Sequence, residues 1–341
     1  MRASSHRHEL IKAQQPRCLH WAGLYIRDVP AEQKIRSLPN CSDKISGLRV
    51  SYMKRILRIF CLILISCCGF CQVNQDIFPD HPGSLICWTE IRSDPRPLRI
   101  YFLKVDLNDG LEVFSLPGED PDGPGPAESQ LTQPIDLFKK NHALAAVNAN
   151  AFAGLSNDKA AADWYEGRPV DIHGIVASGR KIISPIEENR TSFWIDTSEK
   201  PHIGTPKSLD SVSEAVADWF SPLLIDSKII PDPADQALHP RTALGFDDSG
   251  AWLLLVVVDG RQPGFSEGVT LYELAKILQL RKCSQSINLD GGGSSIMLIQ
   301  EPGKDVRTVN SPSGKTPRPV PVMLGVRKRI NSENLSGRGI R

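Results

Sequence analysis

The sequence lacks several features that would each have pointed to a protein class. Its formal net charge is only +1 over 341 residues, which argues against the basic face of a nucleic-acid-binding protein. No segment repeats at a period of 20–50 residues. The apolar run at residues 59–65 is too short to span a membrane. Hydrophobic residues still make up 40% of the chain, which is enough for a sizeable core in one large or two ordinary domains.

Cysteines are also scarce in the region that is expected to fold. Of the eight cysteines, six precede residue 72, and only Cys87 and Cys283 fall in the region with strand and helix patterns. One bridge between these two is an open alternative, because their separation cannot be obtained from sequence. Two buried thiols are the expectation we prefer.

The N-terminal quarter of the chain has the pattern of an export signal behind an extra leader. Residues 1–52 carry no sustained periodicity and are interpreted as an over-extended start. Met53 opens a basic stretch, and residues 59–65 form a short apolar run, the pattern of an export signal over 53–71. Residues 72–84 are then a linker.

The end of this signal resembles a bacterial lipobox. The sequence at 64–67 is LISC, which would allow lipidation of Cys67 and attachment of the protein to a membrane. Ordinary cleavage near Gly69 or Cys71 is the alternative. Both interpretations predict an exported protein, either periplasmic, anchored as a bacterial lipoprotein, or extracellular.

The body, 85–327, is predicted to be a single α+β domain with a mixed, largely antiparallel sheet core and a few packed helices, followed by a basic tail at 328–341. Residues 98–107 alternate as a strand, and the Asn-Asp-Gly turn at 108–110 predicts a hairpin with 111–116. Helices are expected at 134–141, at 211–219 and after the capping box that begins at Thr270. Further strands are expected at 143–147, 242–246, 252–258, 286–289, 296–299 and 320–326.

The stretch at 288–295 (NLDGGGSS) is the strongest candidate for a functional site. Asp290 follows an apolar strand and precedes three glycines, Gly291, Gly292 and Gly293, and two hydroxyls, Ser294 and Ser295. Consecutive glycines let the main chain approach another group closely and can direct several N–H groups at an anion. The alternative is a glycine-rich hairpin in which Asp290 makes an Asx-turn.

Other polar side chains also follow apolar strands. Pairing of 242–246 with 252–258 would bring Arg241 within a residue or two of Asp259, beside Arg261; a purely structural Arg–Asp pair is the alternative. Asn148 and Asn150 follow the strand at 143–147. Ligands of layered sheets bind beyond strand ends, so we expect Asn148, Asp259 and Asp290 to converge.

The motifs HPRTALGF (239–246), VVVDGRQPGFSEGVTLYELA (256–275) and INLDGGGSS (287–295) resemble the phosphodiester glycosidase family. Weaker matches are VNANAF at 147–152, HGIVASGRKI at 173–182, and NSPSG with RPV at 310–320. Many members have glycine where this chain has Ala149. The resemblance spans roughly 85–326 and implies cleavage of a sugar C1–O bond whose leaving group is a phosphate.

The resemblance, together with the residue chemistry, gives roles to specific residues. Asp290 is the expected carboxylate near C1, and Asp259 the second acid or a group that orients an arginine. Arg241, Arg261 and Arg318 are the expected phosphate clamp. The remaining expected substrate contacts are Asn148, Asn150, His173, Ser266, Asn288, Gly291, Gly292, Gly293, Ser294 and Ser295.

Three functions are therefore compared. The first is an exported glycosidase that cleaves a GlcNAc-1-phosphate-type diester in glycans or exopolysaccharide. The second is a lipid-anchored, non-catalytic protein that binds phosphorylated or acidic glycans, and the third is a hydrolase that cuts P–O instead of C–O. No cofactor or metal is assigned, although Asp259, Asp290 and the amides are oxygen ligands that a divalent cation accepts.

Overall fold

The computed structural model describes residues 72–77, 83–155, 163–314 and 316–329. The leader 1–52, the export signal at 53–71 with Cys67, and tail residues 330–341 lie outside the described residues. Everything described belongs to one compact unit, 63–341. Within that part of the chain, no helix is long and apolar enough to cross a membrane.

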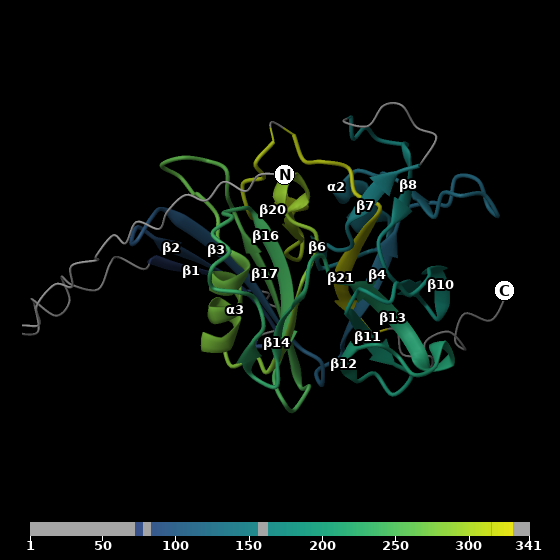
Figure 1. Cartoon of the computed structure of the whole chain (residues 1–341), viewed down its shortest axis with the longest axis horizontal. Helices are drawn as coiled ribbons and strands as arrows, with labels where there is room; N and C mark the ends of the chain where they lie inside the picture. Colours follow the sequence, from purple (N-terminus) through teal and green to yellow (C-terminus); the bar gives the residue numbers. More distant parts are fainter. Residues whose placement is uncertain (1–71, 78–82, 156–162, 315, 330–341) are drawn as a thin grey trace, which may run out of the picture. The chain divides into compact units, whose positions relative to one another are not determined.

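The described chain is mainly β-structure, with four sheets whose paired strands all run antiparallel (Figure 1). The large sheet has the order β1 (Gln72–Ile77), β2 (Leu85–Arg92), β3 (Leu98–Asp106), β17 (Trp252–Val258), β16 (Arg241–Phe246), β18 (Gln285–Asn288), β14 (Pro222–Ile225), β15 (Lys228–Ile229). The inner sheet has the order β20 (Arg307–Thr308), β19 (Met297–Ile299), β6 (Ala145–Asn148), β21 (Val322–Lys328), β4 (Leu111–Pro117).

Two further sheets lie beside these. The side sheet has the order β10 (Lys181–Ser184), β9 (Val176–Ser178), β13 (Val212–Ala217), β11 (Ser192–Asp196), β12 (Pro201–Gly204). The small sheet contains β5 (Ser129–Gln130), β8 (Pro169–Ile172) and β7 (Phe152–Gly154). Two α-helices occur in the described ranges, α2 (Pro134–Lys140) and α3 (Leu271–Leu280).

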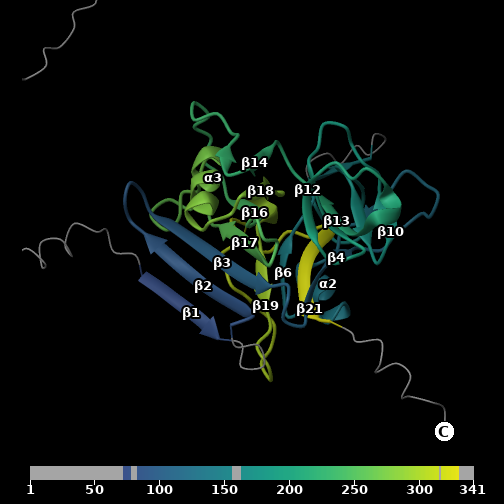
Figure 2. The ribbon, with the colours of Figure 1, turned by 90° about the horizontal axis from the view of Figure 1, so that it is seen from below.

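Side-chain alternation along the strands fixes the layers. In β17, Leu255 and Val257 face the central core, whereas Leu254 and Val256 face a second core that contains residues of α3. The inner sheet does the same: Leu324 of β21 faces the central core, and its neighbour Met323 faces a third core that contains residues of α2. The order of layers is therefore α3, large sheet, inner sheet, α2, and the ribbon of Figure 2 shows α3 against the large sheet.

The predicted capping box and the predicted pairing of 242–246 with 252–258 are confirmed. Thr270 and Glu273 form a reciprocal capping box at the start of α3. Strands β16 and β17 pair with Arg241 opposite Val258, the register expected from sequence. Cys87 and Cys283 are buried and are not joined by a disulfide.

One hairpin, one helix and part of the linker were predicted wrongly. The turn at 108–110 does not close a hairpin, because β3 pairs with β2 and β17 while β4 pairs with β21 in the inner sheet. The turn carries the chain from the large sheet to the inner sheet. The residue types in a turn do not show which sheet the next strand joins. The helix expected at 211–219 is instead strand β13, packed between β9 and β11, where pairing on both edges overrides the helix preference of its alanines. Strand β1 also occupies part of the expected linker at 72–84.

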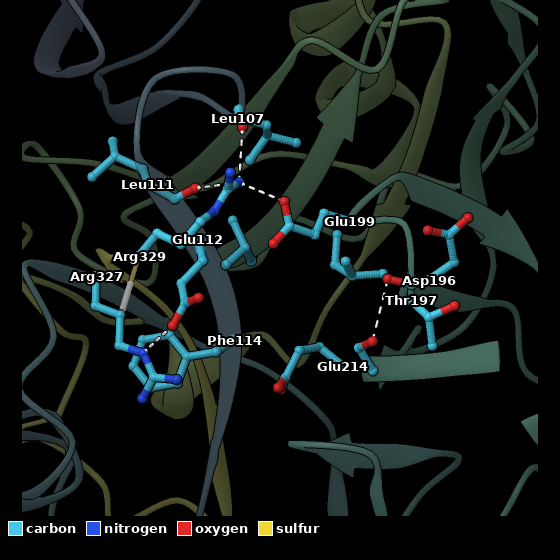
Figure 3. Close-up of a pocket in the computed structure, with 13 residues that line it drawn as sticks. Leu107, Leu111, Glu112, Phe114, Asp196, Thr197, Glu199, Glu214, Arg327 and Arg329 are labelled. Atoms are coloured by element: carbon cyan, nitrogen blue, oxygen red, sulfur yellow. Dashed lines mark hydrogen bonds and ion pairs between the residues drawn. The ribbon is translucent and has the colours of Figure 1, made fainter. Parts of the chain in front are cut away.

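One buried carboxyl group joins the inner and side sheets. Glu214 of β13 accepts hydrogen bonds from the backbone N–H groups of Ser115 (2.7 Å) and Gly179 (2.8 Å). It borders a cavity of about 200 Å³ whose other charged side chains include Glu112, Glu199, Arg327 and Arg329 (Figure 3). Burial raises the pKa of Glu214 to about 7. Arg327 pairs with Glu112 and Arg329 pairs with Glu199 (3.0 Å), so these charged groups are partnered within the protein, which gives the cavity a structural role.

The raised pKa of Glu214 predicts a specific pH dependence of stability. The folded protein holds this proton more tightly than the unfolded chain, so the stabilisation is complete below the ordinary glutamate pKa and is lost as the pH rises toward 7. We expect the free energy of unfolding of the wild type, relative to Glu214→Gln, to fall between about pH 4.5 and 7. Urea unfolding across this range, with the exposed Glu188→Gln as control, measures it; parallel curves for wild type and Glu214→Gln would contradict the assignment.

Candidate active site

The ends of β6, β16 and β18 meet around the carboxamide of Asn148. Its Nδ2 donates to the backbone oxygen of Asp290 (2.7 Å), and its Oδ1 accepts from the Thr242 hydroxyl (2.7 Å) and the Ile296 N–H (3.1 Å). The Asp290 N–H donates to the Ala149 oxygen (2.8 Å). These hydrogen bonds join the large and inner sheets at Asp290, the residue that was predicted to be the catalytic carboxylate. Asn148 is buried and uses its carboxamide within the protein to position Asp290; its contact with a substrate stays a prediction.

The glycine loop is a crossover between sheets, so the hairpin alternative is wrong. Strand β18 belongs to the large sheet and β19 to the inner sheet, and a 3₁₀ turn, η2 (Gly292–Ser294), lies between them. The predicted anion nest is also wrong for most of the loop. The N–H groups of Gly291, Gly292, Ser294 and Ser295 donate to acceptors within the protein, respectively Asp290 Oδ1, Pro240 O, Gly291 O and Gly292 O. These four N–H groups are therefore already hydrogen-bonded within the protein and do not point at a shared anion site.

The glycines instead make room for arginines. A Cβ added at Gly293 would overlap the Arg318 guanidinium, and one at Gly292 would lie 3.1 Å from Nη1 of Arg261. Gly292 also has φ +59°, a left-handed conformation that favours glycine. Two guanidinium groups therefore lie directly against the backbone that follows Asp290.

Arg241 adds a third positive charge beside this loop. Its Cδ lies 3.8 Å from the Cβ position of Gly291, and its guanidinium donates to the carbonyl oxygens of Val269 and Ala237 (both 3.3 Å). Burial and the neighbouring charge of Arg261 lower the pKa of Arg241 to about 10. Arg261 in turn lies 3.2 Å from Nδ1 of His239. Cations this close and partly desolvated favour an anion in front of them.

Asp290 is the acidic group in this positive environment. Burial raises its pKa to about 6, while a hydrogen bond with the Ser294 side chain, the charge of Arg318, the Gly291 N–H and the charge of His173 act in the opposite direction. Arg318 also approaches the Ser294 hydroxyl (3.4 Å). A carboxyl group that titrates near neutral pH can serve as a proton acceptor, a proton donor or a nucleophile.

Asp259 does not have the geometry of a second catalytic acid. It is buried, and its carboxylate accepts hydrogen bonds from Tyr101 (2.9 Å), Asn310 (3.0 Å) and the backbone N–H of Ser311 (3.0 Å). No ion pair joins Asp259 to Arg241 or Arg261 in the described part of the chain. Its fixed place between β17 and the 310–311 loop orients the turn that carries Arg261, which is a structural role.

Two more of the predicted contacts, Asn150 and Ser266, make hydrogen bonds within the protein. Asn150 donates to the oxygens of His173 (2.9 Å) and Ile175 (3.1 Å) and accepts from Ala217 N–H (3.2 Å). Ser266 donates to the backbone oxygen of Asp259 (2.7 Å).

Asn288 donates to the backbone oxygen of Trp219 (2.6 Å), and its Oδ1 is buried without a partner among the described residues. The Ser295 hydroxyl is likewise buried and unpartnered there. His173 remains at the site, stacked on Trp219 with ring centroids 5.1 Å apart.

A cavity of about 440 Å³ opens in front of the arginines. Arg261, Gly293 and Arg318 line it, together with Trp164, Ser313, Gly314, Thr316, Pro317 and Pro319. Trp164 was missed from sequence because a single aromatic residue in a loop has no pattern that marks it. Within the described ranges, no three His, Cys, Asp or Glu residues gather to hold a metal ion, and the divalent-cation contact stays a prediction.

The family model for phosphodiester glycosidases matches residues 141–327, a range that contains Asn148, Asp290 and all three arginines. The chain belongs to this family. A search of the curated proteins finds no significant match.

Among the solved structures that this chain matches, two illustrate the shared fold. One is the zebrafish N-acetylglucosamine-1-phosphodiester alpha-N-acetylglucosaminidase catalytic domain auto-inhibited by its pro-peptide, with TM-score 0.54, 19% identity, and coverage of 77% of this chain and 92% of that one. The other is a hypothetical protein from Synechocystis, with TM-score 0.50, 13% identity, and coverage of 72% and 62%. At these identities the likeness establishes the fold.

The close fit of Gly293 against Arg318 predicts that a single methyl group disables the site. In Gly293→Ala the flexible Arg318 guanidinium must move, which costs the fold little but displaces a cation of the predicted phosphate clamp. We expect kcat/KM to fall on the order of tenfold to a hundredfold with little change in melting temperature. Gly303→Ala, at a left-handed but open position, is the control and should keep full activity; equal activity of both variants would show that Arg318 does not need this position.

Proposed function

We propose that this protein is an exported glycosidase that hydrolyses a sugar-1-phosphodiester of the GlcNAc-1-phosphate type in glycans or exopolysaccharide. The observation that carries the proposal is the Asp290 carboxyl group, with a pKa near 6, beside Arg318 and Ser294 and next to the loop that Arg261 contacts. A carboxyl group next to a cation cluster matches a substrate with a positive centre developing at C1 and a negative phosphate leaving it.

The arrangement assigns a role to each group in the reaction. Arg261 and Arg318 hold the phosphate oxygens in the cavity that they line, and Arg241 adds positive charge behind them. As the C1–O bond breaks, its electron pair leaves with the phosphate, and these cations stabilise the charge that develops there. Ionised Asp290 stabilises the oxocarbenium-like carbon, attacks it, or takes a proton from water, and water finally supplies the oxygen on C1.

A strong general acid is not required in this scheme. Phosphate is a better leaving group than a sugar alkoxide, and the clamp already neutralises it. This agrees with Asp259 being tied into the fold, because the site then works with one carboxylate instead of the usual pair. Asp290 as nucleophile would retain the anomeric configuration and Asp290 as base would invert it.

Cellular placement is part of the proposal. The basic and apolar pattern at 53–71 supports export, and the LISC sequence supports a lipid anchor on Cys67. Glycans and exopolysaccharides outside the cytoplasm are then the accessible substrates.

Removal of the Asp290 carboxylate tests the reaction directly. Asp290→Asn keeps the size and the backbone contacts of the side chain, so we expect turnover to fall on the order of a hundredfold to ten-thousandfold while the melting temperature stays close to that of the wild type. The assay is release of free sugar from a panel of sugar-1-phosphodiesters by protein 72–341. The solvent-exposed Asp248→Asn is the matched control, with wild-type activity.

Oxygen-18 water separates the competing functions. Label in the released sugar supports cleavage at C1–O, whereas label in the phosphate means cleavage at P–O and would overturn the proposal. Tight binding of the diesters with no product after long incubation would instead establish a non-catalytic glycan-binding protein. Full activity of Asp290→Asn would show that another group performs the chemistry.

A further inference from the structure

An exposed aromatic side chain stands next to the candidate active site with no structural reason for its exposure. Phe220 is 60% exposed, and its backbone has φ +84°. A bulky residue in the left-handed region is an outlier that the surrounding structure must enforce. Such strain gathers at functional sites.

The surrounding contacts hold Phe220 in a fixed relation to Asp290. The preceding residue, Trp219, exchanges two hydrogen bonds with Asn288: its N–H donates to the Asn288 oxygen (2.8 Å), and its oxygen accepts from Asn288 Nδ2 (2.6 Å). Asn288 lies two residues before Asp290. After Phe220 the chain enters β14, which pairs with β18. Both sides of Phe220 are thus anchored to the strand that delivers the catalytic carboxyl group.

The Trp219 ring is immobilised as well. His173 stacks on it with centroids 5.1 Å apart and an interplanar angle of 22°, and the Arg190 guanidinium lies 4.3 Å from its centroid. Phe220 packs against Trp219 with centroids 5.1 Å apart, tilted by 53°. Trp219 is therefore a rigid support for Phe220.

Phe220 also borders the positive cluster. The guanidinium carbon of Arg241 lies 6.0 Å from the centre of the Phe220 ring, and the charge of His173 acts on Asp290. A ligand whose anionic group faces the arginines would place its adjoining apolar surface on this ring.

We propose that Phe220 is the stacking surface for the sugar ring of the substrate and so determines specificity for a glycosyl phosphate over phosphate alone. A pyranose has an apolar face of C–H groups, which gains free energy when an aromatic ring removes it from water. Phenylalanine has no polar atom to compete for the sugar hydroxyls. The inference rests on the proposed function, because it assumes that a sugar phosphate occupies the site.

The test compares two probes, N-acetylglucosamine-1-phosphate and inorganic phosphate, by isothermal titration calorimetry. Phe220→Ala should weaken binding of the sugar phosphate about tenfold, leave phosphate binding within about twofold, and raise KM for a cleaved diester more than it lowers kcat. Phe220→Tyr, which keeps a ring, should restore binding. Leu280→Ala, another exposed apolar side chain, is the control and should change neither probe.

The possible outcomes separate this inference from the proposed hydrolysis. A protein that binds the sugar phosphate in a Phe220-dependent way but releases no sugar supports the stacking surface and refutes the hydrolysis. Cleavage by the wild type with unchanged binding and KM in Phe220→Ala refutes the stacking surface and leaves the hydrolysis standing. Equal weakening of both probes in Phe220→Ala would mean that the ring only supports the fold around Arg241, and would also overturn the inference.

Discussion

The Asn148 carboxamide is the contact on which the rest of the site depends. It uses both of its polar atoms to tie the backbone after β18, the hydroxyl of Thr242 on β16 and the N–H of Ile296 before β19 to the end of β6. Two sheets with separate hydrogen-bond ladders meet at this point. A buried amide that lacks any of its hydrogen bonds is costly, so the folded protein is expected to keep all three together. These hydrogen bonds fix the direction in which the chain leaves the large sheet at Asp290.

The second constraint is electrostatic. Arg241, Arg261 and Arg318 surround a loop whose acidic side chain is Asp290, so positive charge exceeds negative charge at the loop itself. Burial lowers the pKa of Arg241 and of Arg318, and the charge of Arg261 lowers both further, whereas the charges of Asp235 and Asp290 act in the opposite direction. In the proposed function, the phosphate of the substrate supplies the negative charge that these cations lack. The glycines after Asp290 let the guanidinium groups of Arg261 and Arg318 approach the backbone. The glycine motif and the cluster of arginines therefore depend on each other.

Sequence reasoning predicted local features well and layer assignments poorly. The β16–β17 register followed from alternation and a short turn, and the Thr270 cap followed from residue types at fixed spacing. The turn at 108–110 and the loop after Asp290 were harder, because residue patterns show that a chain turns but not which sheet it joins. Strand β13 looked helical because alanine favours helices where no partner strand is known. Trp164 and Phe220 are single aromatic residues in loops, and only the folded structure reveals their neighbours.

The most direct test of the account is the titration of the Asp290 carboxyl group by carbon-13 NMR, with the signal assigned through Asp290→Asn. The account predicts a pKa near 6 that rises when inorganic phosphate binds, since a nearby anion disfavours the carboxylate, and rises in Arg318→Gln, which removes a nearby positive charge. A pKa close to that of an ordinary aspartate, unmoved by phosphate and by Arg318→Gln, would contradict it. The carboxyl group would then be remote from the cation cluster.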